Sequence, residues 1–214
     1  MDTFNKNDRN TVKRVPKRGH YDKKTVYEVL DAGFVCQVAF VINDQPFIIP
    51  TIYGRDENTL FLHGSVKSRM MKSLGKGIPV CINVTFTDGI VLARSAFHHS
   101  LNYRSVTVFG TAKTVPHEQK NKALKVISDQ ILRGRWEEAR PPSQKELEVT
   151  SLLAVDIEDA AAKIRTGPPA DDKADLELPI WGGVVPFTTL VGIPLADNYT
   201  PEDMDLPDSI KNII

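Results

Sequence analysis

The sequence predicts a mainly β protein with flanking helices, built on a six-stranded antiparallel β-barrel. Short apolar segments rich in β-branched residues recur between positions 34 and 115, and turn-forming pairs such as Asn43–Asp44 and Asp88–Gly89 separate them. Only one helix is expected among these segments, over residues 66–74. A meander of this kind favours a closed barrel, because closure leaves no unpaired strand edge.

The predicted strands follow one another at short intervals and reverse at tight turns. The meander comprises residues 34–42, 47–53, 59–63, 79–87, 90–97 and 104–115. Asp88–Gly89 is among the strongest two-residue hairpin signals, so we expect the chain to reverse there. Residues 151–157 form one more apolar strand, which we expect to rejoin the barrel.

The flanking helices carry recognisable signals. Asp22 can cap a helix over residues 23–32. Residues 118–133 have the apolar spacing of an imperfect amphipathic helix. Ser143, followed three positions later by Glu146, predicts a capping box at the start of a further short helix.

A chain of 214 residues is long enough for one domain with a substantial core. We expect residues 1–19 to form a flexible basic arm and residues 20–166 to form the barrel domain with its helices. Residues 167–192 would be a linker with a Trp-Gly-Gly segment that completes the domain, and residues 193–214 an acidic tail. Residues 1–24 carry eight Lys or Arg and three Asp, whereas residues 171–214 carry nine Asp or Glu and two Lys. We interpret both ends as solvated tails.

Composition argues against several classes of function. The formal net charge is +0, which gives no general reason to expect binding to nucleic acid or to a membrane. No apolar run reaches the length of a membrane span, and the N-terminus lacks the apolar centre of a secretory signal. Cys36 and Cys81 lie in apolar strands without a partner motif, as reduced core residues do. We therefore expect a cytoplasmic protein.

The first candidate site is the start of the helix expected over residues 66–74. Ser65 is a suitable N-cap, and the same segment holds Lys67, Ser68 and Arg69. A helix N-terminus presents unpaired N–H groups and a positive dipole, so cations there are unfavourable unless an anion lies between them. The pattern therefore indicates a phosphate site, and the alternative is a solvated, lysine-rich surface helix.

A second polar segment separates two apolar strands. Residues 93–105, ARSAFHHSLNYRS, gather hydroxyl, amide, imidazole and guanidinium groups, among them those of Arg94, Ser95, Asn102, Arg104 and Ser105. A surface turn rarely carries so many donors, so we interpret this segment as a polar site, with an ordinary loop as the alternative.

The sequence does not predict a metal site. Its histidines would be His63, His98 and His99, but adjacent histidines normally project apart, and no carboxylate or cysteine stands at ligand spacing from them. The motifs of an esterase nucleophile, a dinucleotide-binding loop and a Walker loop are also missing. These patterns give no support for a nucleophilic enzyme or a nucleotide hydrolase.

The chain resembles the pyridoxamine 5′-phosphate oxidase-like proteins, which are flavin-binding split β-barrels, and among them most of all the flavin-nucleotide-binding subgroup. The resemblance covers residues 18–191 and is carried by residues 51–74, by residues 93–112 and by PIWGGVVP at residues 179–186. The last segment is close to the family pattern Pro-x-x-Trp-Gly-Gly-x-x-Pro. The resemblance implies a split β-barrel homodimer that binds two FMN molecules in clefts between the subunits, with FAD as the alternative flavin.

The resemblance also assigns residues to the flavin. In one subunit, the strand under the flavin ring would correspond to Ile49, Pro50 and Thr51. The segment over the flavin ring would correspond to His63, Gly64 and Ser65. The phosphate ligands of the same subunit would correspond to Lys67, Ser68 and Arg69. The other subunit would supply the groups that correspond to Arg104, Ser105 and Trp181. The polar segment adds Arg94, Ser95 and Asn102 to the predicted cofactor site.

The resemblance fails where vitamin B6 oxidases bind their substrate. Those enzymes hold the substrate phosphate with a cluster that includes an Arg and a His after the Trp-Gly-Gly motif, and Val184–Gly192 contains neither. Arg140 can match one family arginine, and Ser105 stands where a Gln is usual. We therefore expect an FMN-dependent oxidoreductase that acts on a small molecule other than pyridoxamine 5′-phosphate.

Two alternatives stay open at the level of sequence. One is a non-catalytic protein that stores or senses flavin. The other is a haem-binding split barrel, in which a histidine such as His98 would be the axial ligand. His98 and His99 are also the candidates for a general acid, and no catalytic residue is assigned.

Overall fold

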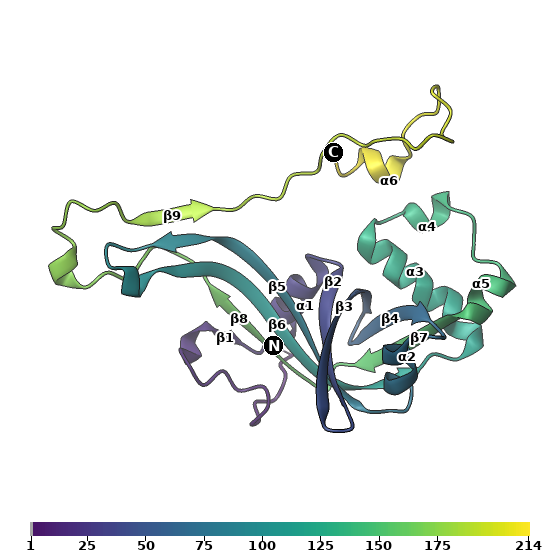
Figure 1. Cartoon of the computed structure of the whole chain (residues 1–214), viewed down its shortest axis with the longest axis horizontal. Coiled ribbons are helices and arrows are strands. Elements are labelled where there is room, and N and C mark those ends of the chain that lie inside the picture. The colour runs from purple at the N-terminus through teal and green to yellow at the C-terminus, as the bar shows by residue number, and fades with distance from the viewer. Residues whose placement is uncertain (1) are drawn as a thin grey trace.

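The computed structural model describes residues 2–214, which form one antiparallel sheet of nine strands with most of the helices at one end (Figure 1). Six strands close into a ring in the order β6–β7–β4–β3–β2–β5, because β5 pairs with β6 as well as with β2. The predicted six-stranded antiparallel ring is therefore confirmed. β1, β8 and β9 extend the sheet outside the ring.

The elements have the following bounds. The strands are β1 (Gly19–His20), β2 (Val35–Ile42), β3 (Gln45–Asp56), β4 (Thr59–Ser65), β5 (Pro79–Leu92), β6 (Ser100–Thr114), β7 (Thr150–Asp156), β8 (Asp159–Arg165) and β9 (Gly183–Pro186). The α-helices are α1 (Lys23–Asp31), α2 (Arg69–Leu74), α3 (Lys120–Ile131), α4 (Arg135–Glu138), α5 (Gln144–Val149) and α6 (Asp208–Lys211). Short 3-10 helices are η1 (Pro16–Arg18), η2 (Ala96–His98), η3 (His117–Gln119) and η4 (Lys173–Asp175).

The ring begins with the tight hairpin between β2 and β3. Asn43 and Asp44 have positive φ angles of 48° and 61°, as the two central residues of a type I′ turn do. This turn sets a register in which Ile42 pairs with Gln45 and the pairing continues along all of β2. The predicted hairpin is confirmed.

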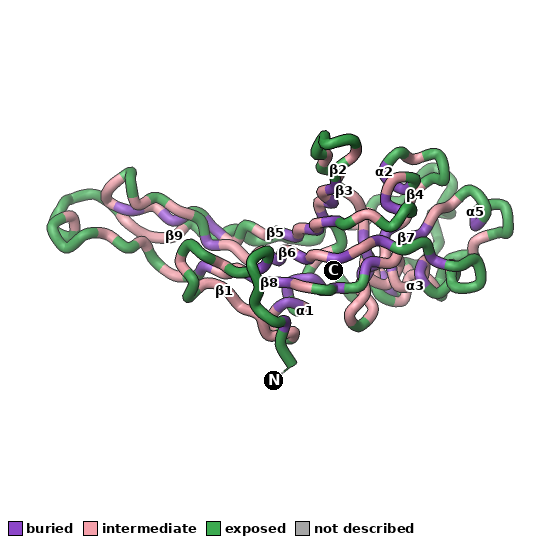
Figure 2. The backbone as a smooth tube through the Cα atoms, turned by 90° about the horizontal axis from the view of Figure 1, so that it is seen from below, coloured by how far each residue is buried: buried purple, intermediate pink, exposed green. Residues whose placement is uncertain are grey.

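The hydrophobic core fills the ring. Its largest fully buried side chains include Tyr53, Leu60, Leu62 and Ile82, and Figure 2 shows buried residues concentrated along the ring strands. A second, smaller apolar cluster joins α3 to the sheet and consists of Val115, Ala123, Ile127 and Leu152. The helical segment is thus packed on the outside of the ring.

The hairpin predicted at Asp88–Gly89 was wrong. β5 continues through this dipeptide to Leu92, with a bulge between Thr87 and Gly89. The Asp88 carboxylate binds the guanidinium group of Arg104 on the neighbouring β6, at 2.9 Å. Pairing with other strands outweighs the local turn preference of the dipeptide, and a bulge takes up the extra residue. The chain reverses later, around η2.

The sequence does not predict β8. Its seven residues, DAAAKIR, are three alanines, three charged residues and one isoleucine, and only the isoleucine favours a strand. In the fold, β8 pairs with β6 from Tyr103↔Arg165 to Phe109↔Asp159, and its alanines are buried. Contacts between distant parts of the chain therefore decide its conformation.

The residues predicted to cap α1 and α5 were identified more reliably than the turn at Asp88–Gly89. Asp22 caps α1 by accepting a hydrogen bond from the main-chain N of Thr25 at 2.8 Å. Ser143 and Glu146 form the predicted capping box of α5. Within residues 2–214, no helix is both long and apolar enough to cross a membrane.

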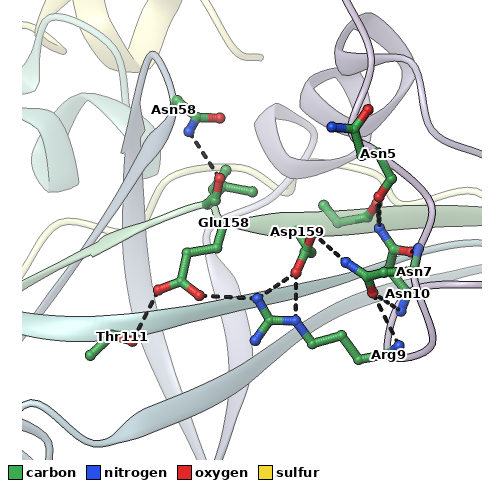
Figure 3. Close-up of polar contacts among 10 residues, drawn as sticks. Asn5, Asn7, Arg9, Asn10, Asn58, Thr111, Glu158 and Asp159 are labelled. Carbon is green, nitrogen blue, oxygen red and sulfur yellow. Dashed lines mark hydrogen bonds and ion pairs between the residues drawn. The ribbon is translucent and has the colours of Figure 1, made fainter.

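The N-terminal segment lies against the sheet, whereas the sequence suggested a flexible arm. Arg9 donates hydrogen bonds to Asp159 Oδ2 at 2.5 Å and to Glu158 Oε2 at 3.0 Å, beside the start of β8 (Figure 3). Asn10 and Phe4 are 4% and 6% exposed. The partners of the arm come from residues about 150 positions later, which local composition does not reveal.

Candidate functional site

α2 begins later than the sequence predicts. It starts at Arg69, and its N-cap is Ser68, which accepts a hydrogen bond from the main-chain N of Met71 at 3.4 Å. Ser65, the predicted cap, is instead the last residue of β4 and pairs with Thr150 of β7. Strand pairing therefore displaces the helix start. A helix of six residues has a small dipole, so any anion here would be held mainly by side chains.

Residues 64–77 keep the charges that suit an anion. The segment contains Lys67, Arg69, Lys72 and Lys76 and no acidic residue. Lys67 and Arg69 are exposed. The guanidinium carbon of Arg69 lies 4.3 Å from the ring centroid of Phe47 on β3, and this stacking holds the cation beside that strand.

The barrel is split next to this segment. β3 and β4 are paired only from Asp56↔Thr59 to Tyr53↔Leu62. Beyond that point β3 continues along β2, and β4 continues along β7. α2 packs closely on the β4 side of the split, because a Cβ atom at Gly64 would lie 2.9 Å from Cγ of Met71. The residues of β3 and β4 that the family resemblance assigns to the flavin ring thus lie on the two sides of one opening.

The three predicted residues of β3 do not share a face. Ile49 and Thr51 pair with Val38 and Cys36, whose side chains are fully buried, so their own side chains face the barrel interior. Pro50 points to the other face and is exposed. A ligand on the outer face would contact Ile49 and Thr51 through the main chain.

The polar segment between β5 and β6 is held by hydrogen bonds within the chain. Arg94 donates to the Asp171 carboxylate from its main-chain N at 2.7 Å and from Nη1 at 2.8 Å. Asn102 is 9% exposed, and its Nδ2 donates to the main-chain O of Gly167 at 3.2 Å. Arg94 and Asn102 therefore fix the linker that follows β8.

The histidines of this segment belong to its turn. His99 Nδ1 accepts a hydrogen bond from the main-chain N of Ala93 at 3.0 Å. His98 Nε2 lies 3.3 Å from Asp172 Oδ2. Ser95 caps η2 with its side chain. Ser95 and His99 thus bond within the reversal of the chain, and His98 lies beside the segment that follows β8.

The other residues predicted to contact the flavin from the second subunit are Arg104, Ser105 and Trp181, and they differ in how far hydrogen bonds within the chain fix their side chains. Arg104 donates three hydrogen bonds of 2.9 to 3.2 Å to Asp88, and these bonds raise the pKa of its guanidinium group. Ser105 Oγ lies 2.9 Å from Thr85 Oγ1. Trp181 is 64% exposed. The indole of Trp181 is the group most available for contact with another molecule.

One chain brings the predicted residues together in two sets. The first set lies around the split between β3 and β4 and the start of α2. The second lies along β5 and β6. Arg94, Ser95 and Trp181 lie beside η2 or the start of β9, whereas Arg104 and Ser105 pair with Phe86 and Thr85 in the middle of β5. Figure 1 shows that the η2 end of these strands is remote from α2.

His63 lines a cavity that the sequence did not predict. The cavity measures about 430 Å³ and lies between β4 and the helical segment, with apolar walls formed by Leu124, Ile127, Ile131 and Trp136. The Nδ1 atom of His63 is buried and has no hydrogen-bond partner among residues 2–214. Burial lowers the pKa of the imidazole below 6.5, so the ring is neutral at pH 7. A neutral imidazole can act as a ligand or as a hydrogen-bond partner.

An ion pair lies at the rim of this cavity. Arg140 donates to both carboxylate oxygens of Glu146, at 2.8 and 3.0 Å. These bonds, together with those from Ser143, lower the pKa of Glu146 to about 2. Both side chains are largely exposed, so the pair adds little to stability. The charge of Arg140 is nevertheless already matched within the chain.

A family model described as pyridoxamine 5′-phosphate oxidase matches residues 22–164, from the start of α1 into β8. The chain belongs to this family. Its resemblance to the family, inferred from the sequence, is therefore confirmed. A search of curated proteins found no match.

Two solved structures are similar to this pyridoxamine 5′-phosphate oxidase-like protein along nearly its whole length. The FAD and heme binding protein of Mycobacterium smegmatis is 33% identical, with a TM-score of 0.89 over 92% of this chain and 97% of that one. The flavocytochrome Anf3 of Azotobacter vinelandii is 35% identical, with a TM-score of 0.90 over 97% of both chains. An FAD-binding protein of Mesorhizobium loti, 17% identical, shares the fold, with a TM-score of 0.51 over 70% of this chain and 98% of that one.

The sequence of this family member held a partial signal for the His63 cavity. The helix predicted over residues 118–133 appeared imperfect because its apolar positions are spread over more than one face. In the structure, Ala123, Leu124 and Ile127 take part in the apolar cluster on the sheet, and Leu124, Ile127 and Ile131 line the cavity. The same apolar residues thus serve the core and the cavity, so the sequence could not tell the two apart.

Proposed function

We propose that this protein binds a flavin nucleotide between two copies of the chain and uses it for redox chemistry. The observation that carries the proposal is the set of four cations in residues 64–77, without an acidic residue, beside the split between β3 and β4. Arg and Lys side chains at such a place suit the phosphate groups of a nucleotide. Membership of the family and similarity to a structure described as FAD and heme binding support the same assignment.

The flavin proposed is FAD rather than FMN. The similar protein of Mycobacterium smegmatis is named for FAD. The four cations from Lys67 to Lys76 suit the phosphate of FMN and the diphosphate of FAD alike, since the two groups carry similar charge. The choice of FAD therefore rests on this similarity.

The arrangement proposed is a homodimer. Arg104, Ser105 and Trp181 of one chain would meet the α2 region of the other, as the resemblance to the family implies. Trp181 directly precedes β9, and the end of the molecule where β9 begins is remote from α2 (Figure 1). Two equivalent sites would follow from the twofold symmetry of such a dimer. Each site would contain residues of both chains.

The chain's own residues would mainly bind and orient the cofactor. Lys67 and Arg69 would hold the phosphates, and stacking on Phe47 would limit the movement of the Arg69 side chain. Trp181 of the second chain would cover part of the flavin and exclude water. When bound, the flavin supplies hydride and electron transfer.

The substrate proposed is a small molecule other than pyridoxamine 5′-phosphate. Val184–Gly192, the segment that follows the Trp-Gly-Gly motif, has neither Arg nor His to bind a substrate phosphate. Arg140, the remaining arginine considered for this role, is paired with Glu146. A phosphate group would therefore find little unpaired positive charge near these residues.

Mass spectrometry of the small molecule released from purified protein tests the flavin proposal. We expect FAD at about one per chain, and anaerobic NADH or NADPH should bleach its absorbance if the protein is an oxidoreductase. A bound flavin that neither donor reduces would favour the storage or sensor alternative. Failure of the purified protein to bind added FAD or FMN would overturn the proposal.

We further propose that the His63 cavity holds a haem. Its apolar walls and the imidazole of His63, whose neutral form is favoured by burial, fit such a group. Both similar proteins described above support this, since one is named for haem and the other is a flavocytochrome. His98, the ligand suggested by the sequence, lies instead beside Asp172 in the β5–β6 turn. When bound, the haem supplies one-electron transfer.

Two histidine variants test this assignment. Titration of the purified protein with haemin should give a Soret band of a histidine-ligated haem. His63→Ala should lose this band or shift it to that of weakly bound haem, whereas His98→Ala should leave it unchanged. The opposite result, loss with His98→Ala alone, would assign the haem to the turn instead of the cavity.

A further inference from the structure

Residues 187–206, here called the C-terminal strap, join two distant parts of the molecule and contact them only at the ends of the strap. The strap begins where β9 ends, and Phe187 N donates to the main-chain O of Asp88 at 3.0 Å. Just beyond the strap, Ser209 N donates to Glu138 Oε1 at 2.9 Å, which attaches α6 to α4. Figure 1 shows the strap running from the β9 end of the molecule to the helical end.

The strap exposes apolar side chains. Leu190, Ile193, Leu195 and Tyr199 are 83%, 89%, 93% and 93% exposed. Single exposed apolar residues are common on protein surfaces, but a continuous series of this kind usually marks a contact with another molecule. A free strap would present these residues to water at a substantial hydrophobic cost.

The main chain of the strap is also without partners. Residues 188–196 make no main-chain hydrogen bond to other residues within 2–214. Long segments without secondary structure are uncommon in compact domains, and those that occur often have a binding role. The two fixed ends nevertheless hold the strap on a defined course.

Cavities lie at both ends of the strap. One, of about 740 Å³, lies between the start of the strap and the sheet and is lined by Phe86, Arg104 and Phe187 among others. The other, of about 730 Å³, lies near α6 and is lined by Arg135 and Leu195 among others. The strap thus leaves space beside it that the rest of the chain does not fill.

We propose that the strap packs against a second copy of this chain, with its apolar side chains buried on the partner. This inference rests on the homodimer of the proposed function. There, Arg104 meets the partner, and Arg104 and Phe187 line the same cavity at the start of the strap. The strap is therefore placed to extend an interface that the flavin site already requires.

The charge of the strap disfavours a membrane as its occupant. Residues 187–206 contain four acidic residues and no Lys or Arg. The cytoplasmic leaflet of a membrane is negatively charged and attracts basic segments. A protein surface formed by a second copy carries no such penalty.

Sedimentation analysis of two triple variants tests the proposal. Leu190→Ser, Ile193→Ser and Leu195→Ser together should raise the dimer dissociation constant at least a hundredfold. The control combines Glu202→Gln, Asp203→Asn and Asp205→Asn in the same strap and should change the constant by less than threefold. Circular dichroism should be unchanged in both, because these residues lie outside the core.

Hydrogen exchange of the wild-type protein gives a second readout. Amides of residues 188–196 should exchange more slowly in the dimer than in a synthetic peptide of the same sequence. Exchange at the peptide rate, or a dimer unaffected by the apolar variant, would overturn the role of the strap and leave the proposed homodimer intact. A wild-type protein that is monomeric with flavin bound would overturn both.

Discussion

His63 is half-buried, and its Nδ1 atom has no hydrogen-bond partner among the residues described. A buried polar atom in this state costs free energy unless something else satisfies it. Burial also lowers the pKa of the ring, because the charged form loses hydration. The imidazole is thus held in its neutral form at the wall of the cavity.

This histidine should make stability depend on pH. Below pH 6.5 the unfolded chain takes up the proton more readily than the folded one, so the free energy of unfolding falls as the pH decreases from 6.5 toward the lowered pKa. Urea denaturation at pH 7.5 and pH 5.5 measures the free energy of unfolding at each pH. The decrease in this free energy from pH 7.5 to pH 5.5 should be smaller for His63→Phe than for the wild type. Equal losses would mean that His63 is not buried in its neutral form.

The exposed His117 provides the control for this measurement. For His117→Phe, the difference in the free energy of unfolding between pH 7.5 and pH 5.5 should equal that of the wild type. The comparison separates the effect of one buried ring from the general effect of acid on the protein.

Arg69 should contribute strongly to flavin affinity. Arg69→Ala should weaken binding by about 1.5–3 kcal/mol, which is typical of a hydrogen bond to a charged group. Lys76→Ala, seven positions further along the chain, should cost less, because Lys76 lies beyond the end of α2. Quenching of flavin fluorescence measures both affinities, and an unchanged value for Arg69→Ala would exclude that residue from the site.

At the scale of elements, the contact between β3 and α3 depends on the absence of a side chain. Gly54 is buried, and a Cβ atom there would lie 2.7 Å from main-chain atoms of Val126 and Ile127. These are backbone atoms of a helix and cannot move aside as a flexible side chain can. Gly54 therefore allows α3, which forms a wall of the His63 cavity, to lie close to the six-stranded barrel.

Gly54→Ala should destabilise the protein by about 1–3 kcal/mol, the usual range for overpacking a core. Urea denaturation of the variant and the wild type measures the change. If Gly54→Ala unfolds like the wild type, α3 must be able to move away from β3, and the cavity would then be larger than 430 Å³.

Elements that depend on neighbouring residues could be predicted, and those that depend on distant partners could not. The caps at Asp22 and Ser143 act within one helical turn, and both predictions were correct. The turn at Asp88–Gly89 and the cap at Ser65 also looked convincing locally, but strand pairing with β6 and β7 overrides them. β8 has almost no local strand preference and exists because β6 offers it an edge.

At the scale of the whole molecule, the ring was predictable, but the arrangement of the site was not. A closed six-stranded ring was predicted and is present, but residues 79–87 and 90–97, expected as two strands, lie mostly in the single strand β5, and β7 is the sixth member of the ring. β5 and β6 extend well beyond the ring and place η2 and the start of β9 far from α2 (Figure 1). Strand length beyond the ring depends on pairing with β8 and β9, which the sequence did not reveal.

Flavin binding and dimer formation should be coupled. If each site needs both chains, diluting the protein below its dimer dissociation constant should release the flavin, and added flavin should strengthen the dimer. Sedimentation at a series of concentrations, followed by absorbance at protein and flavin wavelengths, measures both. Flavin that sediments with a monomer would contradict a site between two chains.

The position of β9 has a consequence for biosynthesis. Residues 183–186 cover the edge of β5 near Gly89, yet they are translated long after the six strands of the ring. Until they leave the ribosome, that edge is open to pairing with other nascent chains. A message that ends prematurely before codon 183 would therefore yield a folded ring with an unprotected strand, which is a route to aggregation.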